Sequence, residues 1–371
     1  MELNNNDGKA KILAYYLPQF HPTEFNDKWY GKGFTEWTNV GKAKPLFRGH
    51  YQPKVPTDLG YYDLRVPEVA EQQAQLAKEA GVFGFAYWHY WFGNGRKLLN
   101  MIPERMVASG KPDFPFCFAW ANESWYKKLW DKNAGNDTLI MEQLYPGEED
   151  IKNHFYYCLP AIKDKRYIRV DERPLFFIYK PLLYSGVRDF MNIWNKLATK
   201  EGLADGFCFV ANAHTMGDYE RIKPFGFDYI TFSFGARLHV DQGVMHIVNG
   251  LKWRINRLLG RPDNLVDYEY VATHMWKPDF DTKEDIIPEL IPHWDHSARS
   301  GKKGQIFVNE SPELWGKMIE IALEGIRSKK NKIITLKSWN EWAEGNYMEP
   351  DIKYGKSYIE VLGKLVNDIT T

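Results

Sequence analysis

The sequence has 371 residues, of which 44% are hydrophobic, 26% are charged and 16% are aromatic. Lysine plus arginine and aspartate plus glutamate each number 48, so no excess charge favours nucleic acid or an anionic membrane as a partner. The three cysteines are too few for a disulfide framework and lack metal-binding spacing. No apolar run suits a signal peptide or a transmembrane segment, which predicts a cytoplasmic protein, or a periplasmic one if a signal peptide has been removed.

Strand-like apolar runs recur along the chain, and most are followed by a segment with helical periodicity. The strand-like runs are residues 11–17, 82–88, 114–120, 174–180, 206–212, 227–233 and 332–339. The clearest helical segments are 68–80, 151–162, 187–201 and 312–329. The last of these has Ser311 as its expected N-cap and Pro312 in its first turn. Near-continuous apolar strands that alternate with helices predict a parallel α/β sheet buried on both faces.

A closed (β/α)8 TIM barrel with long βα loops fits this alternation better than an open doubly wound sheet. An open sheet of that kind is expected to carry a glycine-rich phosphate loop after its first strand, whereas "YYLPQFHP" (15–22) has none. The eighth strand should lie within residues 286–309, where "IIPELIPHWD" and "QIFVNE" both qualify. No internal repeat, linker or low-complexity tract occurs, which predicts one domain over residues 1–371.

Polar and aromatic residues gather where the predicted strands end, which is where (β/α)8 barrels build their active sites. "HYWF" (89–92) follows the second strand, "ANESW" (121–125) the third and "SWNEWAEGNYMEPD" (338–351) the last. Nine of the 14 tryptophans fall in four short segments, three of which are at these strand ends. Because tryptophan rings stack on the C–H faces of sugars while carboxylates bind hydroxyl groups, this clustering favours a glycan site.

Glu341 and Glu344 are the candidate catalytic residues. If the chain forms a helical turn after the last strand, both side chains project from one face, where two carboxylates can act on one bond. Glycoside cleavage needs such a pair, because one carboxyl group must give a proton to the leaving oxygen. The alternative for any E-x-x-E sequence is a surface pair, but the strand end and the adjoining tryptophans favour catalysis.

Ten further residues are candidate substrate contacts, either as stacking rings or as partners for sugar hydroxyl groups. Asn122 and Glu123 could bind a hydroxyl group or staple a loop, and His89 could be a hydrogen-bonding or a core residue. Glu36 and its neighbour lie in a long first loop that could form a binding wall. The ten are Trp37, His89, Trp91, Trp120, Asn122, Glu123, Trp125, Trp339, Asn340 and Trp342. No H-E-x-x-H motif, P-loop or nucleophile elbow occurs, so no metal or cofactor is expected.

Several segments together resemble the WbsX-type proteins of the glycoside hydrolase family 99-like group. They include "YYLPQFHP", "KGFTEWTNVGKAKPLFRGHYQPKVPTDLGYYDLR" (32–65), "SWNEWAEGNYMEPD" and "YGKSYIEVL" (354–362). The resemblance covers about residues 1–200 and 305–363 and is weaker over 233–300. It implies a (β/α)8 barrel that acts on α-mannoside-like bonds inside a polysaccharide, O-antigen or capsule glycan. It also implies that the reaction needs no metal.

The resemblance also implies a role for each glutamate. Glu341 matches the family residue that assists the sugar's own 2-hydroxyl as nucleophile, and Glu344 matches the acid/base. Retention would then proceed through an anhydro sugar, without a covalent glycosyl-enzyme.

Three functions from different classes remain open at this point. The first is a retaining glycoside hydrolase with a glycan as its partner. The second is a glycosyltransferase of lipopolysaccharide or O-antigen biosynthesis, which would need a nucleotide site, and none is visible in the sequence. The third is a non-catalytic glycan-binding protein, which would keep the tryptophans but would not require both glutamates.

Overall fold

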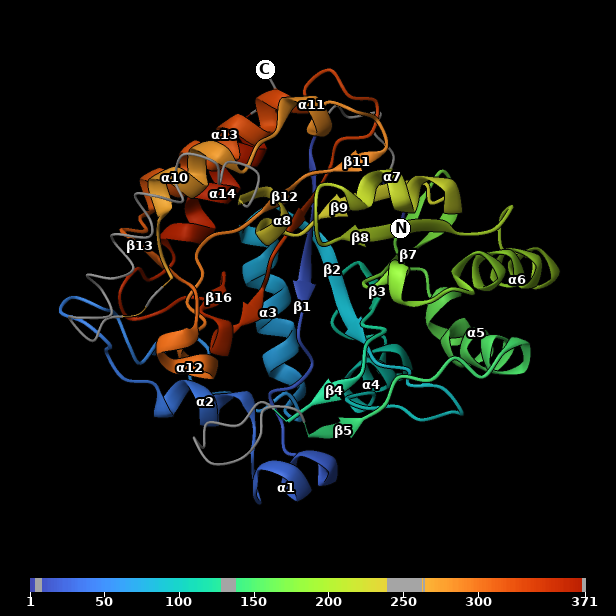
Figure 1. Cartoon of the computed structure of the whole chain (residues 1–371), viewed down its shortest axis with the longest axis horizontal. Coiled ribbons are helices and arrows are strands. Elements are labelled where there is room, and N and C mark those ends of the chain that lie inside the picture. Colours follow the sequence, from blue (N-terminus) through green and yellow to red (C-terminus); the bar gives the residue numbers. More distant parts are fainter. Residues whose placement is uncertain (4–8, 128–137, 239–261, 263, 369–371) are drawn as a thin grey trace.

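The computed structural model describes residues 1–3, 9–127, 138–238, 262 and 264–368, and its centre is a nearly closed barrel of parallel strands (Figure 1). The strands follow the order β11-β9-β8-β7-β3-β2-β1-β14-β12. Seven of them coincide with the runs predicted from the sequence: β1 (Lys11–Tyr16), β2 (Val82–His89), β3 (Phe116–Trp120), β7 (Arg173–Ile178), β8 (Cys208–Ala213), β9 (Tyr229–Phe232) and β14 (Ile333–Leu336). The predicted α/β barrel is confirmed.

The eighth strand is interrupted by Pro288. On one side of it, β11 (Ile286–Ile287) pairs with β9, and on the other side β12 (Glu289–Leu290) pairs with β14. Proline has no N–H to donate to a neighbouring strand, but its carbonyl accepts a 2.9 Å hydrogen bond from the N–H of Thr335. The two short strands therefore complete the ring, within the segment where the sequence predicts the eighth strand.

Helices follow the strands around the barrel. The four predicted from periodicity are α3 (Pro67–Glu79), α5 (Glu148–Ile162), α6 (Val187–Lys200) and α13 (Pro312–Gly325). At the start of α13 the Ser311 side chain accepts a hydrogen bond from the N–H of Leu314, as expected of an N-cap. The other α-helices in the described part of the chain are α1 (Glu24–Tyr30), α2 (Glu36–Lys42), α4 (Met101–Ser109), α7 (Asp218–Ile222), α8 (Phe234–Leu238), α10 (Tyr268–His274), α11 (Pro278–Asp281), α12 (Ser297–Ser300) and α14 (Ser357–Asp368).

Short strands outside the barrel shape its loops. They form antiparallel pairs, except for the parallel β10–β13 pair: β4 (Trp125–Tyr126) with β5 (Leu139–Met141), β6 (Arg169–Val170) with β7, β10 (Leu265–Asp267) with β13 (Ile306–Val308), and β15 (Asn340–Glu341) with β16 (Asn346–Tyr347). Figure 1 shows α1, α2, α12 and the β4–β5 hairpin gathered at the end of the barrel toward which the arrows of β1 and β2 point. The carboxyl ends of the strands and the longest loops therefore meet at one end.

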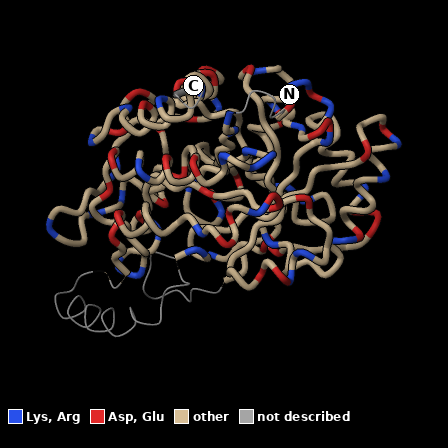
Figure 2. The backbone as a smooth tube through the Cα atoms, turned by 90° about the horizontal axis from the view of Figure 1, so that it is seen from above, with Lys and Arg blue, Asp and Glu red and all other residues tan. Residues whose placement is uncertain are grey.

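The barrel strands are buried on both faces. Every residue of β3, β8 and β9 is buried, because one face fills the barrel and the other packs against the helices. Charged residues of both signs are interspersed along the described backbone (Figure 2). Among the described helices, none is long and apolar enough to cross a membrane.

Candidate active site

A cavity of about 410 Å³ opens at the carboxyl ends of the strands, where (β/α)8 barrels place their active sites. Both predicted catalytic residues, Glu341 and Glu344, line it. Its other charged lining residues are Glu36, Glu123, Arg299 and Lys337. Its aromatic wall is formed by Tyr30, Phe34, Trp88, Tyr90, Trp125, Tyr126 and Tyr179. The cavity therefore combines stacking surfaces with two adjacent carboxylates.

A single turn positions the two carboxylates. Glu341 ends β15, and Glu344 ends the 3-10 turn η5 (Trp342–Glu344), so the side chains lie three residues apart on one face of the turn. The N–H of Glu341 donates to the hydroxyl of Ser338 at 3.2 Å. Gly345 ends the turn with φ +56°, and a Cβ there would lie 2.8 Å from the backbone nitrogen of Asp295, so only glycine fits.

Arg299, from α12, is the cation shared by the acidic residues of the cavity. Its guanidinium lies 2.9 Å from Glu36 and 3.6 Å from Glu341, and it donates a hydrogen bond directly to Glu344. Burial alone would lower the pKa of Arg299, but the carboxylates of Glu36, Glu344 and Glu341 raise it above its ordinary value. Arg299 therefore stays charged and offsets part of the repulsion between the carboxylates.

Glu341 is the more buried of the two predicted catalytic residues, with 7% of its side chain exposed against 15% for Glu344. Burial, followed by the charge of Glu344, raises the pKa of Glu341 to about 7, although Arg299 and Lys337 oppose the rise. Its Oε2 atom makes no hydrogen bond to any residue that the structure describes. Two carboxyl groups this close titrate as a pair, so the charge of Glu344 contributes to the raised pKa of Glu341.

Lys337 directly follows β14 and points into the cavity beside the two carboxylates. Its ammonium lies 5.9 Å from the centre of the Trp88 ring, within the range of a cation–π contact. Burial would lower the pKa of Lys337, but Glu344, Tyr179 and Glu341 raise it above its ordinary value. Sequence reasoning missed this residue, although a lysine at the end of an otherwise buried strand is an available signal.

Of the predicted substrate contacts, Glu123 and Trp125 line the cavity together with Glu341 and Glu344. Glu123 is 41% exposed at the rim, 3.9 Å from the ammonium of Lys180. The ring of Trp125 is held by edge contacts with Tyr90 and Phe92. Glu36, expected in a binding wall, is also at the cavity through its pairing with Arg299.

His89, Trp91 and Trp120 lie on the helix-facing side of the barrel, away from the cavity. Successive residues of a strand point to opposite faces, so Trp88 faces the cavity and His89 faces α5. Trp120 is paired in register with His89 and packs on the same side, and Trp91 stacks on His154 of α5. All three were predicted as substrate contacts at strand ends, but the structure points them toward α5 and not into the cavity, because sequence position alone does not fix which face of the strand a side chain takes.

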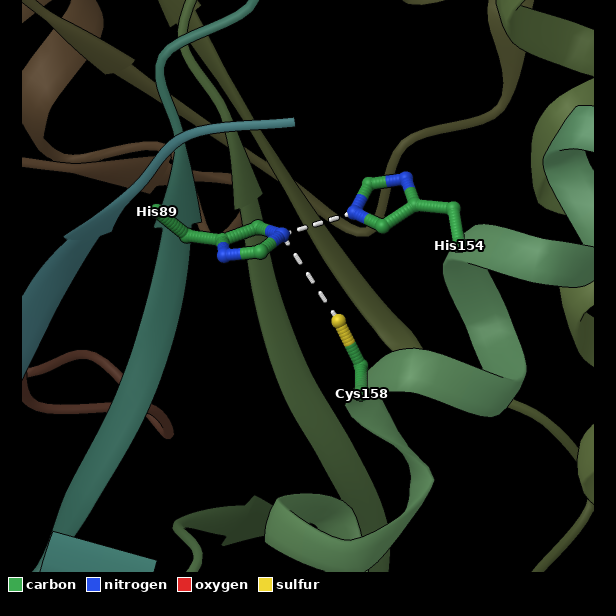
Figure 3. Close-up of side chains that lie close together, drawn as sticks. All are labelled: His89, His154 and Cys158. Atoms are coloured by element: carbon green, nitrogen blue, oxygen red, sulfur yellow. Dashed lines mark hydrogen bonds between the residues drawn. The ribbon is translucent and has the colours of Figure 1, made fainter. Parts of the chain in front are cut away.

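Figure 3 shows His89 extending from β2 toward His154 and Cys158 of α5. The Nε2 atoms of the two imidazoles lie 2.8 Å apart, and the sulfur of Cys158 lies 3.7 Å from Nε2 of His89. His89, His154 and Cys158 have the geometry to bind one metal ion, because their potential ligand atoms all lie within 4.8 Å of one another. Burial lowers the pKa of both histidines and raises that of the cysteine, so the free group is neutral.

Two predicted asparagines join loops instead of lining the cavity. The side chain of Asn122 accepts from the N–H of Lys180 at 2.7 Å and donates to its carbonyl at 3.0 Å, which joins the loops after β3 and β7. Asn340 makes the same paired contact with Leu17, at 2.7 and 3.1 Å, and joins the last strand to the first. Both side chains are fully buried.

The three remaining predicted tryptophans pack around the turn that carries Glu341 and Glu344. Trp342 stacks on Tyr347 at 3.7 Å and contacts Trp37, and Trp339 packs against the barrel beside Phe85. The indole N–H of Trp342 donates to the buried carboxylate of Glu349 at 2.6 Å. Trp37, Trp339 and Trp342 are not among the cavity-lining residues.

Glu349 is another buried carboxyl group, and it lies beneath the turn. It also accepts hydrogen bonds from the hydroxyl of Tyr62 at 2.9 Å and from the amide of Gln73 at 2.6 Å. Burial raises the pKa of Glu349 to about 7, although the donors Trp342, Gln73 and Tyr62 lower it. These contacts fix the segment that carries Glu341 and Glu344.

Comparison with known sequences identifies the family of the chain. The family model described as glycosyltransferase WbsX matches residues 12–362. Two curated relatives, from two strains of Xanthomonas campestris pv. campestris and both described as uncharacterized protein WxcX, are 33% identical over 360 residues. Each match covers 95% of this chain and 49% of the relative, so the chain spans about half the length of the curated relatives it matches.

Solved structures share the fold. A chain described as a glycoside hydrolase-like protein aligns with a TM-score of 0.61 and 14% identity, covering 96% of this chain and 93% of that one. The GH99 endo-alpha-mannosidase from Bacteroides thetaiotaomicron, in complex with bis-tris-propane, aligns with a TM-score of 0.55 and 15% identity, covering 98% and 97%. At these identities the likeness is one of fold.

Proposed function

This chain belongs to the WbsX family, and on that premise we propose that it is a retaining glycoside hydrolase that cleaves α-mannoside-like bonds within a polysaccharide or surface glycan. The observation that carries the proposal is the pairing of Glu341 and Glu344 on one turn at an aromatic-lined cavity. Glycoside cleavage requires two carboxyl groups. The stacking rings beside them provide apolar surface for the sugar.

In the proposed reaction Glu341 takes the proton of the sugar's 2-hydroxyl group, and the freed oxygen attacks the anomeric carbon. Glu344 gives its proton to the departing oxygen as the glycosidic bond breaks, which leaves an anhydro sugar and a free hydroxyl on the leaving group. Water then opens the anhydro sugar with Glu344 as base, while Glu341 returns its proton to the 2-hydroxyl. Both carboxyl groups thus recover their starting states, and the anomeric configuration is retained.

The electrostatics of the pair suit the role of Glu341. A general base works best when its pKa lies near the working pH, and burial with the charge of Glu344 raises the pKa of Glu341 to about 7. Arg299 donates a hydrogen bond to Glu344 and lies 3.6 Å from Glu341, so it contacts both carboxyl groups. The proposed reaction starts with Glu341 ionised and Glu344 protonated.

The family description favours a second candidate, a glycosyltransferase that uses a nucleotide sugar. Such a donor leaves as a nucleoside diphosphate, which needs cations that are not already neutralised. The cations lining the described cavity are Arg299, paired with three carboxylates, and Lys337, whose charge is stabilised by Glu344 and Glu341. This balance supports the hydrolase over the transferase.

The test is to incubate the purified chain with mannan, rhamnan and O-antigen fragments, with and without nucleotide sugars. A hydrolase releases new reducing ends without a nucleotide sugar, and E341Q and E344Q lose that activity. Product growth that depends on a nucleotide sugar would support the transferase instead. Glycan binding with neither reaction would identify a non-catalytic binding protein.

A further inference from the structure

A second cavity, of about 190 Å³, adjoins the one that contains the catalytic pair. The two cavities share four lining residues: Trp88, Tyr179, Lys337 and Glu344. Glu341 lines only the larger cavity, whereas Glu344 lines both. Glu344 therefore stands at their junction.

The wall of the smaller cavity contains two buried polar side chains, Tyr15 and Asn212. Tyr15 of β1 is 1% exposed and Asn212 of β8 is 5% exposed, and both line the cavity. The hydroxyl of Tyr15 and the Oδ1 atom of Asn212 make no hydrogen bond of standard geometry to a described residue. Asn212 does lie close enough to Tyr15 to offset part of the rise that burial causes in the tyrosine pKa. Buried polar groups normally have partners, so Tyr15 and Asn212 form a polar pair in the wall of this cavity.

The rest of this wall has the chemistry of a sugar site. Trp88, stacked on Tyr15 at 4.7 Å, and Trp294, 4.6 Å from Phe234, supply aromatic faces. Glu289, on β12, accepts a hydrogen bond from the N–H of Phe234 at 2.8 Å. Ring faces for C–H groups and polar atoms for hydroxyl groups together match a carbohydrate.

We infer that the smaller cavity is the subsite for one neutral sugar residue on the leaving-group side of the cleaved bond. The inference rests on the proposed function, in which Glu341 acts on the sugar that keeps the anomeric carbon and Glu344 protonates the bridging oxygen. Because Glu344 lines both cavities whereas Glu341 lines only the larger one, the bond lies at their junction, and the leaving-group sugar lies opposite Glu341. The volume is below the roughly 300–1,000 Å³ of typical ligand pockets, which suits one ring.

The charges of the smaller cavity favour a neutral sugar over an anionic group. Lys337 faces the carboxyl groups of Glu289 and Glu344, both of which stabilise its charge. Burial lowers the pKa of His214 to about 4, so this imidazole is neutral at physiological pH. A phosphate or a uronate here would therefore meet no uncompensated positive charge from these lining residues.

The kinetic test compares two substrates with the same reacting sugar, α-linked mannotriose and a dinitrophenyl α-mannoside, which has no sugar as its leaving group. For N212A and E289Q, kcat/KM on the triose relative to the aryl substrate should fall about threefold to tenfold, the worth of one or two hydrogen bonds. Trp125→Ala, in the larger cavity, is the matched control and should leave this ratio within about twofold. An unchanged ratio for both smaller-cavity variants, with folding verified by Tm, would overturn the inference.

A second arm does not depend on turnover. Crystals of E344Q soaked with mannotriose should show one sugar ring in the smaller cavity, in contact with Asn212. If the chain cleaves glycans but no ring occupies this cavity, the inference fails and the proposed function survives. If a ring occupies it but no glycan is cleaved, the cavity is a sugar subsite and the proposed hydrolase is wrong.

Discussion

Replacing Glu341 with glutamine should stabilise the folded chain above pH 7 while it removes activity. Burial and the charge of Glu344 raise the pKa of this carboxyl group from an ordinary 4.5 to about 7. Between these values the folded chain keeps a proton that the unfolded chain has released, so the free energy of unfolding falls as pH rises. At about 1.4 kcal/mol per pH unit, the accumulated loss is about 3 kcal/mol above pH 7. Glutamine does not titrate, so E341Q avoids this loss of stability.

The assay is urea unfolding of both proteins, followed by tryptophan fluorescence at several pH values. The free energy of unfolding of E341Q minus that of the wild type should rise from near zero at about pH 4.5 to about 3 kcal/mol at about pH 8. Glu71→Gln is the matched control, because Glu71 is an exposed partner of Lys111 and its loss should change stability by less than about 0.5 kcal/mol. A difference for E341Q that does not depend on pH would refute the reasoning.

Three further variants test other parts of the account. Arg299→Met removes a charge that lowers the pKa of Glu341, so the pH profile of kcat/KM should move upward by about one pH unit; a fixed profile would count against this. Glu349→Leu leaves three donors unpaired and should lower the free energy of unfolding by roughly 3 kcal/mol or more, measured in urea. His89→Phe breaks the hydrogen bond to His154 and should reduce Tm but leave KM within about twofold; a tenfold rise in KM would place His89 at the substrate.

The barrel was predictable because its strands are continuous apolar runs of the right length, separated by helical periodicity. The eighth strand was harder to delimit, since Pro288 divides it into two pieces of two residues each. A proline at that position removes a donor but leaves an acceptor, so the ring still closes through Thr335. Sequence patterns do not show whether a barrel strand can accommodate such a proline.

The site was only partly predictable, because a position at a strand end does not say which face a side chain takes. His89 and Trp88 are adjacent, yet one faces α5 and the other the cavity. Arg299 lies in 233–300, where the family resemblance is weak, and nothing in its local sequence marks it as a partner of Glu36 and Glu344. Such long-range pairing emerges only when the loops are folded together.

The most direct test of the central claim is leaving-group rescue. It compares the wild type, E341Q and E344Q on a phenyl and a dinitrophenyl α-mannoside. If Glu344 donates the proton, E344Q should lose about 10²–10⁴ in rate on the phenyl substrate and recover most of it on the dinitrophenyl substrate. E341Q should lose a similar factor on both, because the 2-hydroxyl stays unassisted whatever the leaving group. Equal rescue of both variants, or full activity of the double variant, would contradict the account.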